Sequence, residues 1–136
     1  MSVVLTTLFS IVSLALLAAC SPNKTAIPSG GSDVIASGKV VYDESCAVCH
    51  YGGEGSPVAP PLRGSPILVG DPGALLRTIL HGQKGVSVVG GKKFNGIMPG
   101  VPSLSDADAA AVATYIRKEF AGIDQPVSPD VAAAQR

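Results

Sequence analysis

The sequence predicts an all-α domain of short helices joined by long loops. Apolar residues repeat with the period of a helix in three segments, near positions 33–50, 72–81 and 106–120. Residues 82–103, between the second and third segments, contain six glycines and two prolines, which indicates a loop rather than a sheet. No run of residues is interpreted as a strand, and the chain has no internal repeat.

The first helix is expected to run from about Asp33 into the sequence CAVCH at positions 46–50, with Ser32 as its N-cap. Glycine inside a helix costs about 1 kcal/mol relative to alanine, so a second element is expected to pack closely against Gly38. The apolar face of this helix consists of Val34, Ile35, Gly38, Val41 and Tyr42.

The other two helices have local start and stop signals. Asp71 is the predicted N-cap of the helix at 72–81, and Gly82 is its predicted terminator. Ser105, with Asp108 three residues later, resembles a capping box at the start of the helix at 106–120. The apolar stripe of this last helix consists of Ala109, Val112, Ala113, Ile116 and Phe120.

Residues 1–19 resemble a lipoprotein signal peptide. They are rich in apolar residues and carry no charged side chain. The sequence LAAC at positions 17–20 resembles the lipobox of bacterial lipoproteins, in which the cysteine, here Cys20, becomes the acylated first residue. No Lys or Arg precedes the apolar run, so an uncleaved N-terminal anchor is the alternative. Both interpretations export the rest of the chain.

The remaining chain divides into three parts. Residues 20–32 are expected to form the acylated cysteine and a flexible linker, and twelve such linker residues span about 17 to 21 Å. Residues 33–120 are the predicted domain, and residues 121–136 are expected to be a disordered tail. Ser21, directly after the acylated position, resembles lipoproteins that are sent to an outer membrane.

The sequence CAVCH at positions 46–50 places two thiols and an imidazole within one helical turn. This spacing is the attachment signature of c-type haem: Cys46 and Cys49 each add to one haem vinyl group, and His50 binds the iron. Two alternatives use the same residues. A structural zinc site needs four ligands, for which only His81 remains, and a thioredoxin-like dithiol requires a βαβ context that is absent from the pattern.

Met98 is the candidate for the second axial ligand of the iron. It is the only methionine after Cys20, and it lies between turn-forming residues in the sequence NGIMPG. A methionine thioether commonly fills this position in electron-transfer cytochromes and raises the reduction potential. His81 is the competing ligand, in a bis-histidine site, although a histidine at the end of a helix is also electrostatically favourable without such a role.

A prosthetic group would supply a core that the chain otherwise lacks. Only five aromatic residues follow Cys20, and three short helices with long loops bury little apolar surface. The ten basic and ten acidic residues give a formal net charge of zero, which argues against nucleic acid as a partner. The sequence contains no paired carboxylates or nucleophile–base arrangement that would indicate an enzyme.

These features together resemble the class I monohaem cytochromes c of bacteria, in a lipoprotein form. The cytochrome c domains of cbb3-type oxidases and of alcohol dehydrogenase cytochrome subunits are particularly similar. The resemblance covers residues 33 to 120 and includes the spacing of Gly38 and Tyr42 from CAVCH, the proline loop APPLRGSP at 59–66, and the ligand loop NGIMP at 95–99.

The resemblance implies specific contacts. Gly38 would lie where the first and last helices cross, near Val112 and Tyr115. The carbonyl of Pro60 or Pro61 would accept the proton of His50 Nδ1 and fix the orientation of the ring.

The resemblance also implies a function. A small cytochrome c fold of three or four short helices around one covalent haem c, with its iron, would carry single electrons between a protein donor and a protein acceptor and would not be an enzyme. Its lipid would hold it on the periplasmic side of a bacterial membrane, either as a shuttle or as a subunit of a larger complex. The alternative is a haem enzyme or ligand sensor with an open sixth position.

Overall fold

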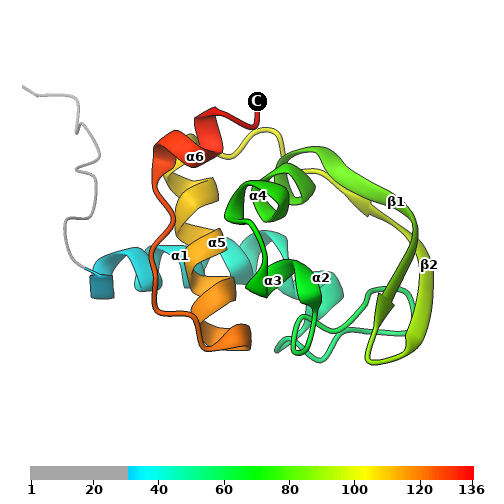
Figure 1. Cartoon of the computed structure of the whole chain (residues 1–136). Coiled ribbons are helices and arrows are strands. Elements are labelled where there is room, and N and C mark those ends of the chain that lie inside the picture. Colours follow the sequence, from blue (N-terminus) through cyan, green and yellow to red (C-terminus); the bar gives the residue numbers. More distant parts are fainter. Residues whose placement is uncertain (1–30) are drawn as a thin grey trace, which may run out of the picture.

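The computed structural model describes residues 31–136 and shows a mostly helical fold with a two-stranded hairpin (Figure 1). This confirms the predicted helical class. The predicted signal peptide, Cys20 and linker residues 21–30 lie outside the described part of the chain. In order, the elements are α1 (Gly31–Ser45), α2 (Ala47–His50), α3 (Pro66–Val69), α4 (Pro72–His81), β1 (Gly82–Val89), β2 (Lys92–Pro99), α5 (Asp106–Ala121) and α6 (Pro129–Ala133).

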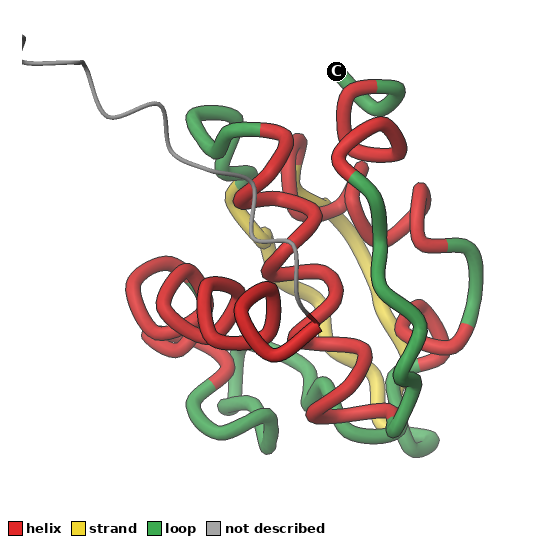
Figure 2. The backbone as a smooth tube through the Cα atoms, turned by 90° about the vertical axis from the view of Figure 1, so that its left-hand side faces the viewer, coloured by secondary structure: helices red, strands yellow, loops and turns green. Residues whose placement is uncertain are grey.

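Helices α1 and α5 cross at Gly38, as the helical glycine predicts (Figures 1 and 2). A Cβ at Gly38 would collide with the carbonyl of Ala111 and would lie 2.8 Å from Tyr115 Cβ. The nearest neighbours are therefore Ala111 and Tyr115, rather than Val112. The ring of Tyr42 also packs against that of Tyr115, with a centroid separation of 5.4 Å. These contacts fix the direction of α1 and hence the position of CAVCH at its end.

Local capping sets the bounds of α4 and α5. The side chain of Asp71 accepts hydrogen bonds from the backbone N–H groups of Gly73 and Ala74, both at 3.1 Å. Gly82 is the C-cap of α4. At α5, the hydroxyl of Ser105 accepts from the N–H of Asp108 at 3.1 Å. These capping predictions are confirmed, whereas Ser32, the predicted N-cap of the first helix, lies inside α1.

The glycine-rich segment after α4 forms an antiparallel hairpin, so the prediction of a loop without strands at 82–103 is wrong. Strand β1 pairs with β2 along its full length, from Gly82 opposite Pro99 to Val89 opposite Lys92. The two residues of the turn, Gly90 and Gly91, have φ angles of +57° and +76°. A two-residue hairpin turn of type I′ requires positive φ at both positions, which glycine adopts without strain.

The C-terminal residues pack against the helices, so the prediction of a disordered tail at 121–136 is also wrong. The chain reverses at Gly122, which is the left-handed C-cap of α5, and runs back along that helix to α6 (Figure 1). The N–H of Val127 donates to Thr114 Oγ1 at 2.9 Å. Val127 and Ala132 are buried members of the hydrophobic core. Apolar burial therefore orders the tail.

Within residues 31–136, the hydrophobic core is built from the helices, the tail and the loop around Leu62. The most deeply buried large side chains are Leu68, Leu76, Leu80 and Val112. No hairpin residue belongs to this cluster, although Val89 and Phe94 are each only 6% exposed. The hairpin and the helical core are thus separate apolar layers. No helix in this part of the chain is both long and apolar enough to cross a bilayer.

Candidate haem-binding site

The CAVCH sequence closes into a single turn at the end of α1. The N–H of Cys46 donates to Tyr42 O at 2.8 Å, and the N–H groups of Cys49 and His50 donate to Cys46 O at 3.2 and 3.0 Å. The phenol of Tyr42 donates to Tyr51 O at 2.7 Å and fixes the end of the turn. The two thiols and the imidazole therefore start from one rigid backbone segment.

His50 is oriented by the proline loop. Its Nδ1 lies 3.1 Å from the carbonyl oxygen of Pro60, so Nδ1 carries the proton and donates it, as the resemblance implies. The other ring nitrogen, Nε2, is left to act as a ligand. Burial lowers the pKa of His50, an effect that the hydrogen bond to Pro60 partly opposes. Both the tautomer and the lowered pKa favour a neutral imidazole, which is the form that binds metals.

The proline loop is held against His50 by its own tight backbone. The N–H groups of Gly53 and Gly55 donate to His50 O at 2.9 and 3.2 Å. Gly55 has a φ of +74°, and a Cβ there would lie 2.6 Å from both Ala59 O and Pro61 N. A side chain at Gly55 would therefore displace the carbonyl that orients the imidazole.

The cysteines do not have the properties of a redox dithiol. Cys46 is half-buried, Cys49 is exposed, and both are free thiols. Burial, followed by the proximity of Cys49, raises the pKa of Cys46 to about 11. Thioredoxin-like chemistry needs a thiol with a depressed pKa, because the thiolate is the nucleophile. This environment disfavours the dithiol alternative.

The zinc alternative also lacks its ligands in the described part of the chain. No group of three or more His, Cys, Asp or Glu side chains within residues 31–136 is arranged to hold a metal ion. His81, the remaining histidine, places its Nε2 2.5 Å from the backbone carbonyl of Gln135. It lines neither of the two cavities that His50 lines, so the structure does not bring the competing ligand to the site.

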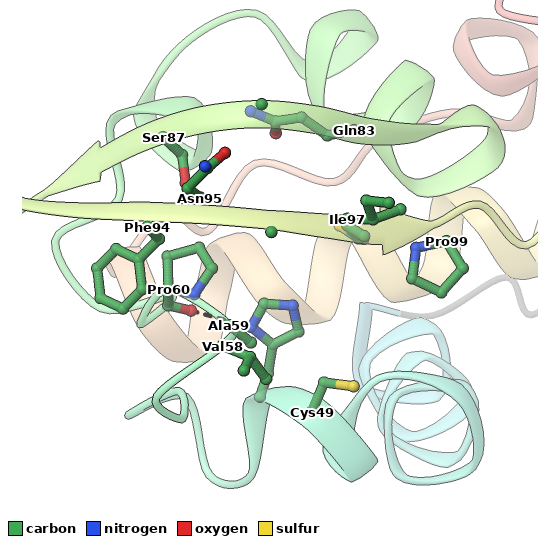
Figure 3. Close-up of a pocket in the computed structure, with 14 residues that line it drawn as sticks. Cys49, Val58, Ala59, Pro60, Gln83, Ser87, Phe94, Asn95, Ile97 and Pro99 are labelled. Carbon is green, nitrogen blue, oxygen red and sulfur yellow. Dashed lines mark hydrogen bonds between the residues drawn. The ribbon is translucent and has the colours of Figure 1, made fainter.

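The hairpin faces the CAVCH turn across two cavities that share lining residues, of which Figure 3 shows the larger. One has a volume of about 460 Å³ and is lined by Cys49 and β2, and the other has a volume of about 210 Å³ and is lined by Cys46 and the helical core. Figure 3 shows Cys49 on one side of the larger cavity, with Gln83 of β1 and Phe94 of β2 on the other. The residues common to both cavities are His50, Pro60, Gln83, Ser87 and Met98.

Met98 therefore lines the same cavities as His50, from the opposite element. In the hairpin it pairs with Gln83, so these two residues share the face of the sheet that is directed at the cavities. The apolar floor of the smaller cavity comes from Leu68, Leu75, Ile79 and Ile116. Soft sulfur, a neutral imidazole and apolar walls are a donor set and a lining suited to haem. The larger cavity, with a volume of about 460 Å³, also lies in the size range of ligand pockets, which is about 300 to 1,000 Å³.

A family model for cytochrome c matches residues 35–119 of the chain. The chain belongs to the cytochrome c family. Members of this family are typically electron carriers that bind haem c covalently. Because the match extends from α1 almost to the end of α5, it covers the CAVCH turn, both cavities and the hairpin of this cytochrome c.

Two proteins named cytochrome c-552, both from Thermus thermophilus, are each 39% identical to this cytochrome c over 87 residues. The aligned region covers 60% of the present chain. It covers 66% of one relative and 58% of the other, so the chain spans less than two thirds of their length. The similarity is distant.

Sequence reasoning did not identify the hairpin side of the cavities. Gln83, Ser87 and Phe94 line them, yet the segment was predicted to be a loop. A usable signal was present in the sequence VSVVGGKKF at 86–94, since Gly-Gly between two runs with apolar residues is typical of a two-residue hairpin.

Proposed function

We propose that this protein is an exported, lipid-anchored monohaem cytochrome c that passes single electrons between protein partners. One observation carries the electron-transfer part of this proposal: the CAVCH turn and Met98 face the same pair of cavities from opposite elements. Cys46 and Cys49 would hold the haem through thioethers, and His50 Nε2 and Met98 Sδ would be the axial ligands. The iron of such a group supplies a centre that exchanges one electron while both ligands remain bound.

The walls of the cavities support electron transfer rather than catalysis. Apart from His50 and the two cysteines, their lining contains no Asp, Glu, Lys, Arg or Tyr. A general acid or base must lie within hydrogen-bond reach of the reacting group. Met98 in the wall opposite His50 also disfavours the alternative of an enzyme or sensor with an open sixth position.

The hairpin offers a positively charged surface for a partner. Lys84, Lys92 and Lys93 are exposed on it, and residues 82–99 contain no Asp or Glu. Val86 and Ile97 are also 58% and 72% exposed on the same two strands. Lys84, Val86, Lys93 and Ile97 share one face of the hairpin by their register, whereas Lys92 lies on the face of Phe94, with its Nζ 5.1 Å from the centroid of that ring. Exposed lysines attract an acidic protein over a long range, and the exposed apolar side chains offer it an apolar contact.

Electron-transfer kinetics test both the function and this surface. The wild-type protein should be reversibly reduced by one electron and should then reduce an acidic redox protein. Replacing Lys84, Lys92 and Lys93 with glutamine should slow that second-order step about tenfold at low ionic strength, because charge steering increases association rates 10- to 1,000-fold. The difference should vanish near 1 M salt, where the screening length is about 3 Å.

A matched variant controls for net charge. Lys39, Arg63 and Lys118 lie outside the hairpin and form ion pairs with Asp43, Glu119 and Asp124. Their replacement with glutamine removes the same three charges and should leave the rate within about twofold of wild type. Equal slowing by both triple variants would mean that overall charge, not the hairpin, governs the encounter.

The lipid anchor is proposed from the sequence alone. The lipobox-like LAAC at 17–20 and the Pro/Ser/Gly-rich residues that follow support acylation at Cys20 and a tether to the domain, and Ser21 favours the outer membrane. The likeness to lipoprotein cytochromes and to cytochrome domains of membrane-bound oxidoreductases agrees with a position on the periplasmic side of a bacterial membrane.

Membrane fractionation tests the anchor. In a bacterial host with lipoprotein processing, the wild-type protein should sediment with membranes, and the Cys20→Ser variant should move to the soluble periplasmic fraction because stable anchoring requires acyl chains. Mass spectrometry of the purified wild-type protein should find the acylated cysteine at the mature N-terminus. Retention of Cys20→Ser in the membrane would support the uncleaved anchor instead.

A further inference from the structure

The C-terminal strap, residues 122–136, lies beyond the region that matches the cytochrome c family. It begins at the end of α5, runs back along that helix and ends beside the segment that follows Met98 (Figure 1). Its middle is fixed by the Val127–Thr114 hydrogen bond and by buried Ala132. This course brings the end of the strap close to the wall of the cavities that contains Met98.

Arg136 holds the segment after Met98. Its Nε lies 2.8 Å from Asp106 Oδ1, and its Nη1 donates to Pro102 O at 2.9 Å. Its Nη2 donates to Leu104 O. One guanidinium therefore binds two carbonyls of the short connection between β2 and α5, together with a carboxylate in the first turn of α5. Hydrogen bonds from a charged donor are stronger than neutral ones.

The strap also contacts the residue that directly precedes β1, at the open end of the hairpin. His81, the last residue of α4, bonds to the backbone carbonyl of Gln135 through Nε2. Arg77 Nη2 donates to Gln135 Oε1 at 2.7 Å, one turn earlier in the same helix. Residues 135 and 136 of the strap therefore contact both the chain that enters the hairpin and the chain that leaves it.

The segments that Gln135 and Arg136 contact lie directly before β1 and directly after β2, and both are close to the backbone of Met98. A Cβ at Gly82 would collide with the carbonyl oxygen of Met98, and a Cβ at Gly100 would lie 2.5 Å from Leu80 O. The N–H of Val101 donates to Ile79 O at 2.9 Å. The backbone around Met98 is thus packed directly on the end of α4, and it leads within a few residues to Pro102 and Leu104, whose carbonyls Arg136 binds.

We infer that the strap, through Arg136, is a positioning element that keeps Met98 in place as the distal ligand. The inference rests on the proposed function, because it assumes that Met98 binds the iron. Dissociation of Met98 requires movement of residues 99–104, and the hydrogen bonds of Arg136 raise the free energy of that movement. A strap that stabilises only the closed state lowers the population of molecules in which the sixth position is open.

Imidazole binding to the ferric, full-length protein measures this population. The Arg136→Ala variant should bind imidazole about tenfold faster and with about tenfold higher apparent affinity than wild type, since the loss of charge-assisted hydrogen bonds has effects of this order. Arg136→Lys, which keeps the charge but not the forked donors, should give an intermediate value. The signal is loss of the weak absorption band at the red end of the visible spectrum that a methionine–iron bond produces.

Lys118→Ala provides the matched control. It removes an ion pair with Asp124 at the opposite end of the same strap, and its imidazole binding should equal that of wild type. Equal rates for wild type and Arg136→Ala, with the methionine band present in both, would overturn the inference. Absence of the band from the wild-type protein would overturn the assignment of Met98 itself, which separates the two failures.

Discussion

Replacing both Cys46 and Cys49 with alanine should yield a colourless protein that is largely unfolded at room temperature. The thioethers would be lost, and with them the group that fills the space between the hairpin and the helices. The larger cavity alone has a volume of about 460 Å³. At about 24 cal/mol per Å³ of empty cavity, this corresponds to at most about 11 kcal/mol, as large as the whole stability of a small domain of about 5 to 15 kcal/mol.

The hairpin should be lost first in this double variant, because its buried side chains depend on the filled cavity. None of its residues joins the helical core cluster within residues 31–136. An isolated two-stranded hairpin is marginally stable in water. The aromatic contacts of Tyr42 with Tyr115 and Phe120 would retain part of the α1–α5 crossing.

Circular dichroism and hydrogen exchange of the purified protein measure both effects. Cys20→Ser is the control, since it removes a thiol that lies outside the described residues and should leave covalent haem and helix content unchanged. A Cys46→Ala, Cys49→Ala protein that kept the cooperative thermal transition of the wild type would show that the cavity need not be filled for folding.

The helices were predictable because their signals are local. Asp71, Pro72 and Gly82 specify α4 within a dozen residues, and the Ser105–Asp108 pair specifies the start of α5. Gly38 was informative for a different reason. Glycine inside a helix lowers its stability, so its presence indicates that another element packs closely against that position. The contact with Ala111 accounts for it.

The strap was mispredicted because its order comes from contacts distant in sequence, whereas the hairpin was missed although its Gly90–Gly91 turn is a local signal. The hairpin places Phe94 against the larger cavity, whose opposite wall comes from Cys49, His50 and the loop at 58–60. The strap contains several small and polar residues typical of disordered tails, but Thr114 and His81 provide its hydrogen-bond partners from α5 and α4. Neither partner can be identified from the local composition of the segment.

For the candidate site, the sequence indicated the CAVCH residues and Met98, but it did not indicate the hairpin that forms one wall of the cavities. The CAVCH spacing is a local signal. Met98 was predicted because it is the only methionine after Cys20. The proline loop was expected only from a family resemblance, which left Pro60 and Pro61 open, and the structure selects Pro60. The roles of Cys46, Cys49 and Met98 in holding haem stay predictions.

Replacing Met98 with alanine should open the distal side of the iron without removing the haem. Cys46, Cys49 and His50 line the two cavities from the CAVCH turn, not from β2, so a substitution in β2 should leave them in place. The ferric protein should lose the methionine band and become high-spin. Its reduction potential should fall by about 0.1 to 0.3 V, within the range of roughly 0.8 V that axial ligands set, because the thioether favours the reduced iron.

A hairpin variant with the ligand intact controls for changes in β-structure. Val86 is 58% exposed on β1 and lines neither cavity, so Val86→Ala should retain both the band and the potential. If Met98→Ala kept the wild-type spectrum and potential, another side chain would have to fill the sixth position. His81 would then have to leave Gln135, which requires the strap to detach from the end of α4. The spectrum of Met98→Ala combined with His81→Ala would decide between that rearrangement and an open site.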